Sequence, residues 1–479
     1  MIPDILRFQD QLVDSVSLLG SAAQVLSGEI ELSPAPEVEL PKSPFFTRTV
    51  LMLSLEDRVA YQAAVASFAD RADRNIPANV YGGRRSNDPD LFLKDGVTQW
   101  LAWKERVKTD LENYPWMIKT DITAYFDALQ HSVLFGAIEA HNPDPRILEA
   151  LRRMLRAWTV APSQGIPQGP NASRFLQNVY FLPIDQEMIA GPWRYYRFID
   201  DIRILGHTRA EAKAGLKILE RECKRRGLVL SVQKTKLLEG EDAVRDWDDA
   251  EIDAASYLMR VGRQKEARRH LRRILSRAIR GRGDLDGRQA RFSLWRLMIL
   301  RDDRALRTVL SDIEDLGPLS SRLALYLKPF LGRKVVQDAL KAFLQDGDTN
   351  TSPFLACWLY AALLDHSERP PDSLVPHLRK VARNRNLPAY LRVFAANVLA
   401  RARMRVDLDW IRLEVRSEYD PELVRGYLVA LARTGALDGA TAARAAQRVP
   451  HLKRTIRYLR GRSDLPSVLT GRGRMPVEA

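Results

Sequence analysis

The chain has 479 residues, more than one hydrophobic core usually organises, so two or three domains are expected. Its 46% hydrophobic and 28% charged residues exclude a largely disordered protein, and its two cysteines, Cys223 and Cys357, have no neighbours at zinc-ligand spacing. Lysine and arginine outnumber aspartate and glutamate by 74 to 60, and the resulting formal charge of +14 favours a polyanionic partner over an inert basic surface.

The same features predict a cytoplasmic protein with no membrane partner. No apolar run reaches the roughly 18 residues that a membrane-spanning helix needs. The first residues, Met1 to Asp4, lack the basic and apolar regions of a signal peptide. The scarcity of cysteines is typical of a reducing compartment.

In chain order, the first feature is a helical pattern over residues 5–30, followed by prolines that interrupt regular structure up to residue 44. We therefore expect an N-terminal helical segment and a Pro-rich linker over residues 1–45. Short apolar runs mixed with helices follow, from Arg48 to about Leu238. From about Ala254 onward the pattern is almost wholly helical, which predicts a HEAT-like or irregular α-solenoid, with a compact bundle as the alternative.

Two segments in the middle of the chain could hold a ligand. The apolar run from Trp116 to Ile122 predicts a strand that ends at Asp121, where a carboxylate suits metal binding but is more often a turn or helix cap. The loop over residues 164–170, with Gln168 and Gly169, leads into an apolar helix. Its glycines let the backbone approach a ligand closely, although a plain loop before a helix has the same composition.

The segment over residues 195–204 predicts a β-hairpin with Asp200 and Asp201 at its turn, because aromatic and β-branched residues flank the acidic pair on both sides. Thr208 and Glu211 then form a capping box for a helix that ends near Gly227. The apolar run over residues 228–232 predicts a strand that leads to Lys234.

In this order, the motifs resemble the palm of reverse transcriptases, in which a carboxylate strand, a Gln-Gly loop, a Tyr-x-Asp-Asp hairpin and a Gly-Leu-x-Leu…Lys-Thr strand follow one another. The resemblance covers about residues 45–240. The short fingers region, the segment over residues 55–62 and the trailing helices are most similar to the abortive-infection and unknown-group bacterial enzymes associated with phage defence. The resemblance implies an α+β right-hand polymerase, with fingers over residues 46–115, a palm over 116–250 and a HEAT-like, basic all-α domain over 251–479.

The resemblance also implies a role for each matching residue in an RNA-directed DNA polymerase that uses two Mg²⁺ ions, with Mn²⁺ as an alternative. The metal site would comprise Asp121, Ile122, Asp200 and Asp201, with Lys234 acting near the pyrophosphate unless it is only a solvated lysine. The nucleotide contacts would be Arg48, Arg58, Ile122, Phe126, Gln168, Gly169 and Ser173. Phe126, five residues after Asp121, would exclude a ribose 2′-hydroxyl, which predicts deoxynucleoside triphosphates as substrates; a core aromatic is the alternative.

Nucleic-acid contacts are expected in two places. Phe198 stands where many relatives carry tyrosine near the primer end. The basic segment over residues 263–282 would line an RNA or DNA path through Arg268, Arg269, Arg272 and Arg273, because Glu266 is the only acid among its cations. The alternative for that segment is a solvated charged helix. The expected partners are RNA, such as a structured noncoding RNA, the DNA product, and further copies of the chain.

Two other functions compete with this interpretation. An RNA-dependent RNA polymerase shares the palm and the Asp-Asp turn, but commonly has a polar or acidic residue where this chain has Phe126. A non-catalytic RNA-binding scaffold has no reason to keep three acids crowded together against their mutual repulsion. The identities of the template and the primer stay open.

Overall fold

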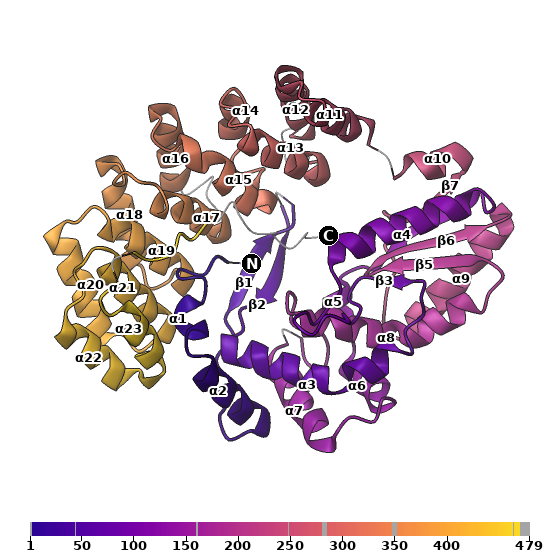
Figure 1. The fold of residues 1–479 in the computed structure, drawn as a ribbon, viewed down its shortest axis with the longest axis horizontal. Coiled ribbons are helices and arrows are strands. Elements are labelled where there is room, and N and C mark those ends of the chain that lie inside the picture. The colour runs from indigo at the N-terminus through magenta and orange to yellow at the C-terminus, as the bar shows by residue number, and fades with distance from the viewer. Residues whose placement is uncertain are drawn as a thin grey trace. The chain divides into compact units, whose positions relative to one another are not determined.

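The computed structural model describes residues 2–469 apart from residues 44, 160, 248, 280–284, 347–351 and 463. Arg280 and Arg282 of the basic segment lie outside the described residues. The chain divides into two compact units, drawn in Figure 1. Among the described residues, the sheet unit comprises Val16–Glu37 and Val50–Asp249, and the helical unit comprises residues 2–15, Val38–Thr49 and residues 250–469. The division at Asp249 lies next to the boundary predicted at residue 250.

The sheet unit is built on a mixed five-stranded sheet with the strand order β3-β5-β6-β4-β7. Strand β4 pairs antiparallel with β6 and β7, β5 pairs antiparallel with β6, and β3 pairs parallel with β5. The strands are β3 (Val80–Tyr81), β4 (Trp116–Asp121), β5 (Arg194–Phe198), β6 (Asp201–Gly206) and β7 (Lys236–Glu239). This sheet confirms the mixed helix and sheet architecture that the sequence predicts.

Both faces of this sheet are buried by helices, as Figure 1 shows for α4 on one side and α8 and α9 on the other. Because side chains alternate along a strand, neighbouring residues enter different cores. Ile118 and Ile204 pack into the core that contains α8 and α9, whereas Met117 and Leu205 pack with Trp103 of α4. The helices are α4 (Gly96–Leu111), α8 (Asn171–Ile189), α9 (Arg209–Arg225) and α10 (Gly240–Arg245).

The remaining helices of the sheet unit are α2 (Ser15–Ser27), α3 (Leu55–Asp73), α5 (Tyr125–Ala128), α6 (His131–Glu139) and α7 (Pro145–Ala157). The predicted cap of α9 is confirmed: the Thr208 hydroxyl accepts a hydrogen bond from the Glu211 backbone N–H. The strand predicted over residues 228–232 is wrong, because only Leu230 forms a bridge, to Ile122. Val229 and Val232 are exposed, so the apolar run there does not indicate a buried strand.

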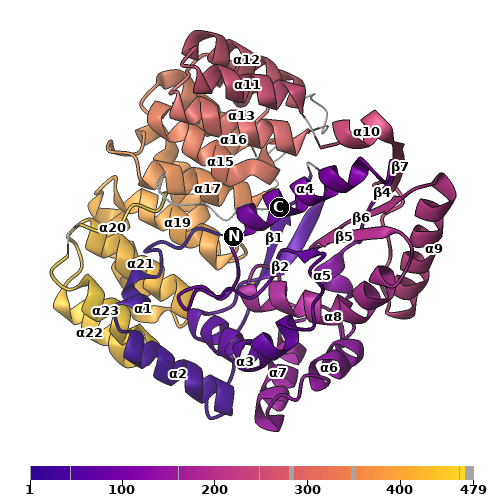
Figure 2. The same ribbon diagram turned by 45° about the vertical axis from the view of Figure 1, so that its right-hand side comes forward.

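The helical unit stacks its helices in succession, which Figure 2 shows from a second direction. Helices α13, α15, α17, α19 and α21 each contact the next one in this series, and α12, α18 and α20 each contact a member of it. Helices α17, α19 and α21 are buried over nearly their whole circumference, as their almost continuous apolar sequences require.

The helices of this unit are α1 (Gln9–Leu12), α11 (Ala250–Arg260), α12 (Gln264–Ala278), α13 (Gly287–Ile299), α14 (Leu306–Ser311), α15 (Ser320–Leu327), α16 (Lys334–Gln345), α17 (Pro353–Leu364), α18 (Val375–Arg383), α19 (Ala389–Ala400), α20 (Arg405–Ser417), α21 (Pro421–Arg433), α22 (Gly439–Arg448) and α23 (Lys453–Leu459). Short 3-10 turns occupy Gly317–Leu319, Lys328–Phe330, Asp372–Leu374 and Pro450–Leu452. No helix among the described residues combines the length and apolarity that crossing a bilayer demands.

The N-terminus differs from the expected helix and linker in two ways. Strands β1 (Glu37–Pro41) and β2 (Thr47–Leu51) form a two-stranded sheet where the prolines predicted irregular structure. A proline is compatible with a strand end because its fixed φ suits extended backbone and its missing N–H need not be paired there. Residues 1–15 belong to the helical unit, so the predicted segment over residues 1–45 is not one structural element.

The interaction that holds residues 1–15 in the helical unit is a buried ion-pair cluster. The Arg425 guanidinium of α21 donates to Asp10 at 2.7 and 2.8 Å and to Asp4 at 2.7 and 3.0 Å. The Asp10 side chain is fully buried and also accepts a hydrogen bond from Thr455 at 2.6 Å. Side chains more than 400 residues apart in the sequence therefore join the first residues of the chain to α21.

We predict that Arg425→Ala destabilises the helical unit by about 3–5 kcal/mol, because it leaves two buried carboxylates without a counter-charge. In thermal unfolding followed by circular dichroism, this loss should lower the Tm by about 6–20 °C. Arg405→Ala is the matched control, since the Arg405 side chain is 96% exposed and such substitutions change stability by less than about 0.5 kcal/mol. Equal Tm values for the two variants would contradict the assignment.

Candidate active site

Three aspartates meet at one end of the sheet because of strand register. Strand β4 ends at Asp121 and β6 begins at Asp201, and these two residues are partners in the β4–β6 ladder. On the other side of β6, Phe198 pairs with Asp201, so that only Ile199 and Asp200 form the turn. Local hairpin geometry and one strand pairing thus bring together the three acids that the sequence singled out.

A pocket of about 370 Å³ opens beside two of these acids. It is lined by Lys119, Thr120, Asp121, Asp201, Gln233, Lys234 and Lys236. Lys234 donates from Nζ to Asp121 Oδ2 at 2.9 Å, which places the predicted lysine directly on a predicted metal ligand. The pocket therefore joins carboxylates to a group of lysines, as a site for a phosphorylated ligand requires.

Sequence reasoning missed Lys119 and Lys236. Lys119 lies two residues before Asp121, so the period of a strand places both on one face, and this spacing was the available signal. Lys236 is the partner of Lys119 in the β4–β7 ladder, a pairing that the sequence alone does not reveal. Lys119 is held by Asp246 at 2.7 Å.

The carboxylates repel one another and are partly desolvated. Burial, then the charges of Asp121 and Asp201, raises the pKa of Asp200 to about 7. Burial also raises the pKa of Asp201, although the nearby Arg203 opposes the shift. Partial burial would lower the pKa of Lys234, but its hydrogen bond to Asp121 and that residue's charge outweigh burial and raise it. This arrangement of acids therefore favours the binding of cations.

Arg203 supplies a fixed positive charge beside Asp201. Its guanidinium lies 3.8 Å from the Asp201 carboxylate. The guanidinium carbon also lies 5.1 Å from the ring centre of Trp103 and 4.8 Å from that of Trp247. Burial lowers the pKa of Arg203, but an arginine has so high a pKa that it stays charged at neutral pH. Cation–π contact with two rings keeps this charge in place.

The donor set fits a divalent cation that keeps ligands from water and phosphate. Among the described residues, no group of three or more His, Cys, Asp and Glu side chains forms a ready-made metal cage. Magnesium needs only one or two carboxylates and takes its other ligands from water and phosphate oxygens. Asp121, Asp200 and Asp201 could supply those carboxylates, and the buried Ile122 could contribute only its backbone oxygen. A cation at Asp121 would replace the Lys234 ammonium there.

The tip of the hairpin holds an unusual backbone conformation. Ile199 has a φ of +59°, in the left-handed region that a β-branched residue rarely adopts. Its N–H donates to the Tyr81 carbonyl at 3.3 Å, and its own carbonyl accepts from Arg197 Nη1 at 2.9 Å. Gly82 makes this close approach possible, because a Cβ there would lie 2.9 Å from the Ile199 side chain. The acidic turn is therefore held from both sides.

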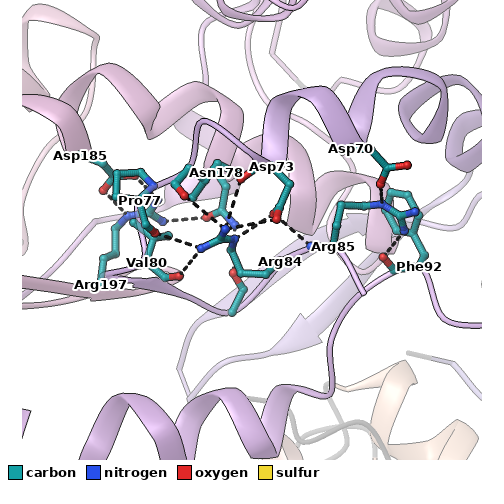
Figure 3. A network of polar contacts seen from close by, with 12 residues as sticks. Asp70, Asp73, Pro77, Val80, Arg84, Arg85, Phe92, Asn178, Asp185 and Arg197 are labelled. Carbon is teal, nitrogen blue, oxygen red and sulfur yellow. Dashed lines mark hydrogen bonds and ion pairs between the residues drawn. The ribbon is translucent and has the colours of Figure 1, made fainter. Parts of the chain in front are cut away.

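Arg197 anchors this turn to the interior of the sheet unit. Figure 3 shows its guanidinium meeting Asp185 and Asn178 of α8. The Asp185 carboxylate accepts two hydrogen bonds from Arg197, at 2.9 and 2.6 Å, and both side chains are fully buried. Asn178 accepts from Arg197 at 3.0 Å and donates to the Gly82 carbonyl at 2.9 Å. One buried cation thus connects α8 to the residue beside Asp200.

A second arginine holds the neighbouring strand in place. Arg84 donates to Asp73 at the end of α3 and to the carbonyls of Pro77 and Val80, as Figure 3 shows. These contacts fix the approach to β3, which pairs with β5 next to the hairpin tip. Arg84 therefore supports the strand that carries the Tyr81 carbonyl.

Three predicted nucleotide contacts lie close together around α5. The Phe126 side chain is half-buried against the core, and its carbonyl accepts a hydrogen bond from Ile166 at 3.0 Å. Gln168 donates to Asp127 at 3.0 Å, next to Phe126 in the sequence. Gly169 has a φ of +111° and open space where a Cβ would stand, so the backbone there is accessible.

Two predicted site residues are buried instead. Ser173 is fully buried, and its hydroxyl lies 3.1 Å from the Tyr61 hydroxyl, so it packs α8 against α3 rather than facing a nucleotide. Phe198 is only 4% exposed, and its ring centre lies 5.6 Å from that of Trp103. Its ring therefore faces α4 and not a primer. Both differences arise because helices cover positions whose exposure depends on tertiary packing.

The two predicted arginines of the fingers lie in different units. Arg48 is exposed on β2, within the helical unit. Arg58 is half-buried on α3 in the sheet unit, and this burial lowers its pKa. Neither residue lines the pocket beside Asp121. Their predicted contact with a triphosphate stays a prediction.

Most of the arginines of α12 that we predict to contact nucleic acid lie close to acidic side chains from other segments. The predicted contacts are Arg268, Arg269, Arg272 and Arg273. Asp302 lies 3.7 Å from Arg268 and 3.1 Å from Arg272, and Glu251 lies 3.3 Å from Arg273. Arg269 is exposed. The scarcity of acids within the helix therefore does not show that its arginines lack acidic partners, because those partners come from α11 and from the loop after α13.

Most of the sheet unit is similar to a known family of proteins. Residues 47–266 match the family model described as reverse transcriptase (RNA-dependent DNA polymerase). The matched range contains all three aspartates and Lys234. Over this range the chain is similar to reverse transcriptases. The match supports the enzyme class that the sequence predicts, an RNA-directed DNA polymerase.

Individual relatives of the reverse transcriptase domain are distant. Protein YkfC of Escherichia coli (strain K12) is 26% identical over 169 residues, which cover 34% of this chain and 43% of that protein. Apo telomerase from Candida tropicalis, truncated from its C-terminal domain, matches at 14% identity and a TM-score of 0.34, over 47% of this chain and 56% of that one.

A telomerase from Candida albicans in complex with a TWJ fragment of telomeric RNA matches at 11% identity and a TM-score of 0.32, over 71% of this chain and 66% of that one. These low scores add nothing to the family match. The chain spans less than half of the length of the curated relative.

We predict that Arg197 acts as a positioning residue for the acidic turn. Arg197→Met alone should destabilise the sheet unit, because it leaves Asp185 buried and unpaired. The double variant Arg197→Met/Asp185→Leu removes both charges and should recover most of the Tm, yet it still lacks the hydrogen bond to the Ile199 carbonyl. We expect its kcat for nucleotide incorporation to fall about 10- to 100-fold with little change in KM. A double variant with full activity would reduce the pair to structural packing.

Proposed function

We propose that the protein is a reverse transcriptase that extends a primer with deoxynucleotides by two-metal nucleotidyl transfer. The observation that carries this proposal is the register of the β4–β6 ladder, which opposes Asp121 to Asp201 while a two-residue turn presents Asp200 beside them. The raised pKa of Asp200, about 7, indicates an acid that is stabilised when cations arrive.

Each residue of the pocket has a role in this chemistry. Bound divalent ions, Mg²⁺ or Mn²⁺, would activate the attacking hydroxyl and stabilise the leaving pyrophosphate. Asp121 and Asp200 would be the principal carboxylate ligands, with Asp201 adjacent and the Ile122 carbonyl as a further ligand. Lys234, whose side chain is 61% exposed, can turn from Asp121 to neutralise or protonate the pyrophosphate.

The other contacts would select and align the nucleotide. Phe126, whose side chain is half-buried, would pack against the sugar and exclude a 2′-hydroxyl. The Gln168–Gly169 backbone, accessible and free of a Cβ at its second residue, would contact the nucleotide and the templating base. Lys119 and Lys236 line the same pocket and add positive charge toward the triphosphate.

The proposed setting is antiviral defence in the bacterial cytoplasm. Support comes from the resemblance of the short fingers and trailing helices to abortive-infection and unknown-group enzymes. In this setting the template would be RNA, such as a structured noncoding RNA, or the synthesis would be primed by the protein itself. A HEAT-like organisation of the helical unit and homo-oligomeric assembly belong to the same proposal.

The experiment that tests the function measures incorporation of labelled dATP and of labelled ATP, each with and without Mg²⁺. We expect incorporation of dATP only, and only with the metal. Incorporation of ATP in place of dATP would indicate an RNA polymerase. Incorporation of neither nucleotide, by a folded protein that binds RNA, would indicate a non-catalytic scaffold.

We predict that Asp121→Asn and Asp200→Asn each abolish deoxynucleotide incorporation while the protein stays folded. The substitutions remove a charged metal ligand and leave the side-chain volume nearly unchanged. For Asp200, the loss of repulsion should keep the Tm at or above that of the unmodified protein. Primer-extension assays and thermal unfolding measure the two effects, and full activity in either variant would refute the metal assignment.

We predict that Phe126→Val admits ribonucleotides, because the smaller side chain leaves room for a 2′-hydroxyl. The ratio of kcat/KM for dATP to that for ATP should fall by at least tenfold, a change of about 1.4 kcal/mol in relative transition-state binding. Phe135→Val in α6, another aromatic of the same core, is the control and should leave the ratio unchanged. Unaltered discrimination in an active Phe126 variant would leave the ring as a core residue.

A further inference from the structure

The turn that carries Lys234 is joined to the end of β4 by hydrogen bonds of its backbone. The Lys234 side chain is 61% exposed, so packing alone does not fix its direction. The turn begins at Ser231, whose N–H donates to the Asp121 carbonyl at 2.7 Å. It closes at Thr235, whose N–H donates to the Ser231 carbonyl at 3.0 Å. The backbone of a proposed metal ligand therefore fixes the start of the turn that carries the lysine.

Two threonine hydroxyls extend this connection. Thr235 Oγ1 lies 2.6 Å from the Ser231 carbonyl oxygen and 2.7 Å from Thr120 Oγ1. A carbonyl oxygen only accepts hydrogen bonds, so Thr235 gives its single hydroxyl proton to Ser231. The Thr120 hydroxyl must then be the donor in the contact between the two threonines. The hydrogen bonds therefore run in one direction, from Thr120 through Thr235 to the turn.

The position of Thr120 connects the turn to the acidic end of the sheet. Thr120 is fully buried and directly precedes Asp121, the last residue of β4. The Asp121 carboxylate accepts a hydrogen bond from the Lys234 ammonium at 2.9 Å. Lys234 is thus linked to two successive residues of β4, to Asp121 through its ammonium and to Thr120 through the turn that carries it.

We propose that Thr120 and Thr235 are positioning residues that hold Lys234 beside Asp121. A lysine side chain has several rotatable bonds, so a fixed turn reduces the number of places that its ammonium can reach. When Lys234 leaves Asp121, the turn keeps its ammonium at the same pocket, where it can act on the pyrophosphate. The role of Lys234 in this proposal rests on the proposed polymerase function, but its position beside Asp121 can be measured without synthesis.

Substitutions of the two threonines separate positioning from stability. Thr235→Val removes the acceptor of the buried Thr120 hydroxyl, and an unsatisfied buried hydroxyl should lower the Tm. Thr120→Val/Thr235→Val replaces both hydroxyls by methyl groups of nearly the same volume and should recover most of the Tm. The second variant still lacks the hydrogen bonds that fix the turn. We therefore expect a stable protein in which Lys234 is poorly positioned.

Binding of Mn²⁺, followed by the paramagnetic resonance signal of the free ion, measures the position of Lys234 without polymerisation. The ammonium competes with a cation for Asp121, so Lys234→Ala should tighten Mn²⁺ binding about two- to fivefold, as expected for a partly exposed ion pair. Thr120→Val/Thr235→Val should tighten it by about twofold, because the ammonium is held there less firmly. In a chain with Lys234→Ala, the threonine substitutions should change Mn²⁺ binding by less than about 1.5-fold, because the group through which they act is missing.

Primer extension gives the second measurement. Thr120→Val/Thr235→Val should lower kcat about tenfold with little change in KM, and should have no further effect on a chain with Lys234→Ala. Thr235→Ser keeps the hydroxyl and should retain kcat to within about twofold.

The matched control is Thr208→Val, which removes the hydroxyl that caps α9 in the same unit. It should lower the Tm, as the loss of a helix cap does, but leave Mn²⁺ binding and kcat unchanged. A loss of stability alone is thereby distinguished from a loss of positioning.

Two results would overturn the proposal. Full kcat in Thr120→Val/Thr235→Val, or threonine effects that multiply with those of Lys234→Ala, would leave the hydroxyls as structural contacts of the turn. A folded, unmodified chain that incorporates no nucleotide would overturn the polymerase function instead. The Mn²⁺ measurements would then still decide whether the threonines position Lys234, so the two failures are distinct.

Discussion

Repulsion among three carboxylates is the constraint that the acidic end of the sheet must satisfy. In this structure each acid is relieved in a different way. The Lys234 ammonium donates a hydrogen bond to Asp121, and Arg203 lies 3.8 Å from Asp201. The pKa of Asp200 is raised to about 7, so this acid is partly protonated near neutral pH. Two of these three arrangements, the Lys234 contact and the proton, are reversible. Metal cations that bind these carboxylates could therefore replace them without rearrangement of the backbone.

The backbone stays fixed because its supports are buried and charged. The turn at Ile199 holds a strained φ, and strain of this kind costs on the order of 1–3 kcal/mol and persists only where surrounding contacts determine it. Arg197 supplies one such contact, and its pairing with Asp185 in a fully buried site leaves it no alternative position. The acidic turn is thus rigid, whereas the exposed Lys234 beside it can move. A site that must exchange ions for protons needs both properties.

The sequence predicts the parts of this site that depend on local pattern. A strand that ends in an acid, a two-residue acidic turn and a capped helix are all local, and the structure contains each of them. The sequence could not predict that Phe198 is buried, because its exposure depends on α4, which lies about ninety residues earlier in the chain. For the same reason the sequence does not predict the burial of Ser173, the position of Lys236 beside the pocket, or the contact of residues 1–15 with α21. In each case the deciding partner lies far away in the sequence.

The ion pairs of the basic helices also depend on partners that are distant in the sequence. The excess of cations indicates a polyanionic partner, but a count of acids within one helix does not show which cations are available to that partner. Helix α12 has the denser run of arginines, yet acids from α11 and from the loop after α13 pair with several of them. On α13, the ring of Phe292 lies against the Arg296 guanidinium, with 3.5 Å between the ring centre and the guanidinium carbon. Because an ion pair within the protein must be broken before its arginine can bind phosphate, the paired arginines of α12 are weaker phosphate contacts than their number suggests.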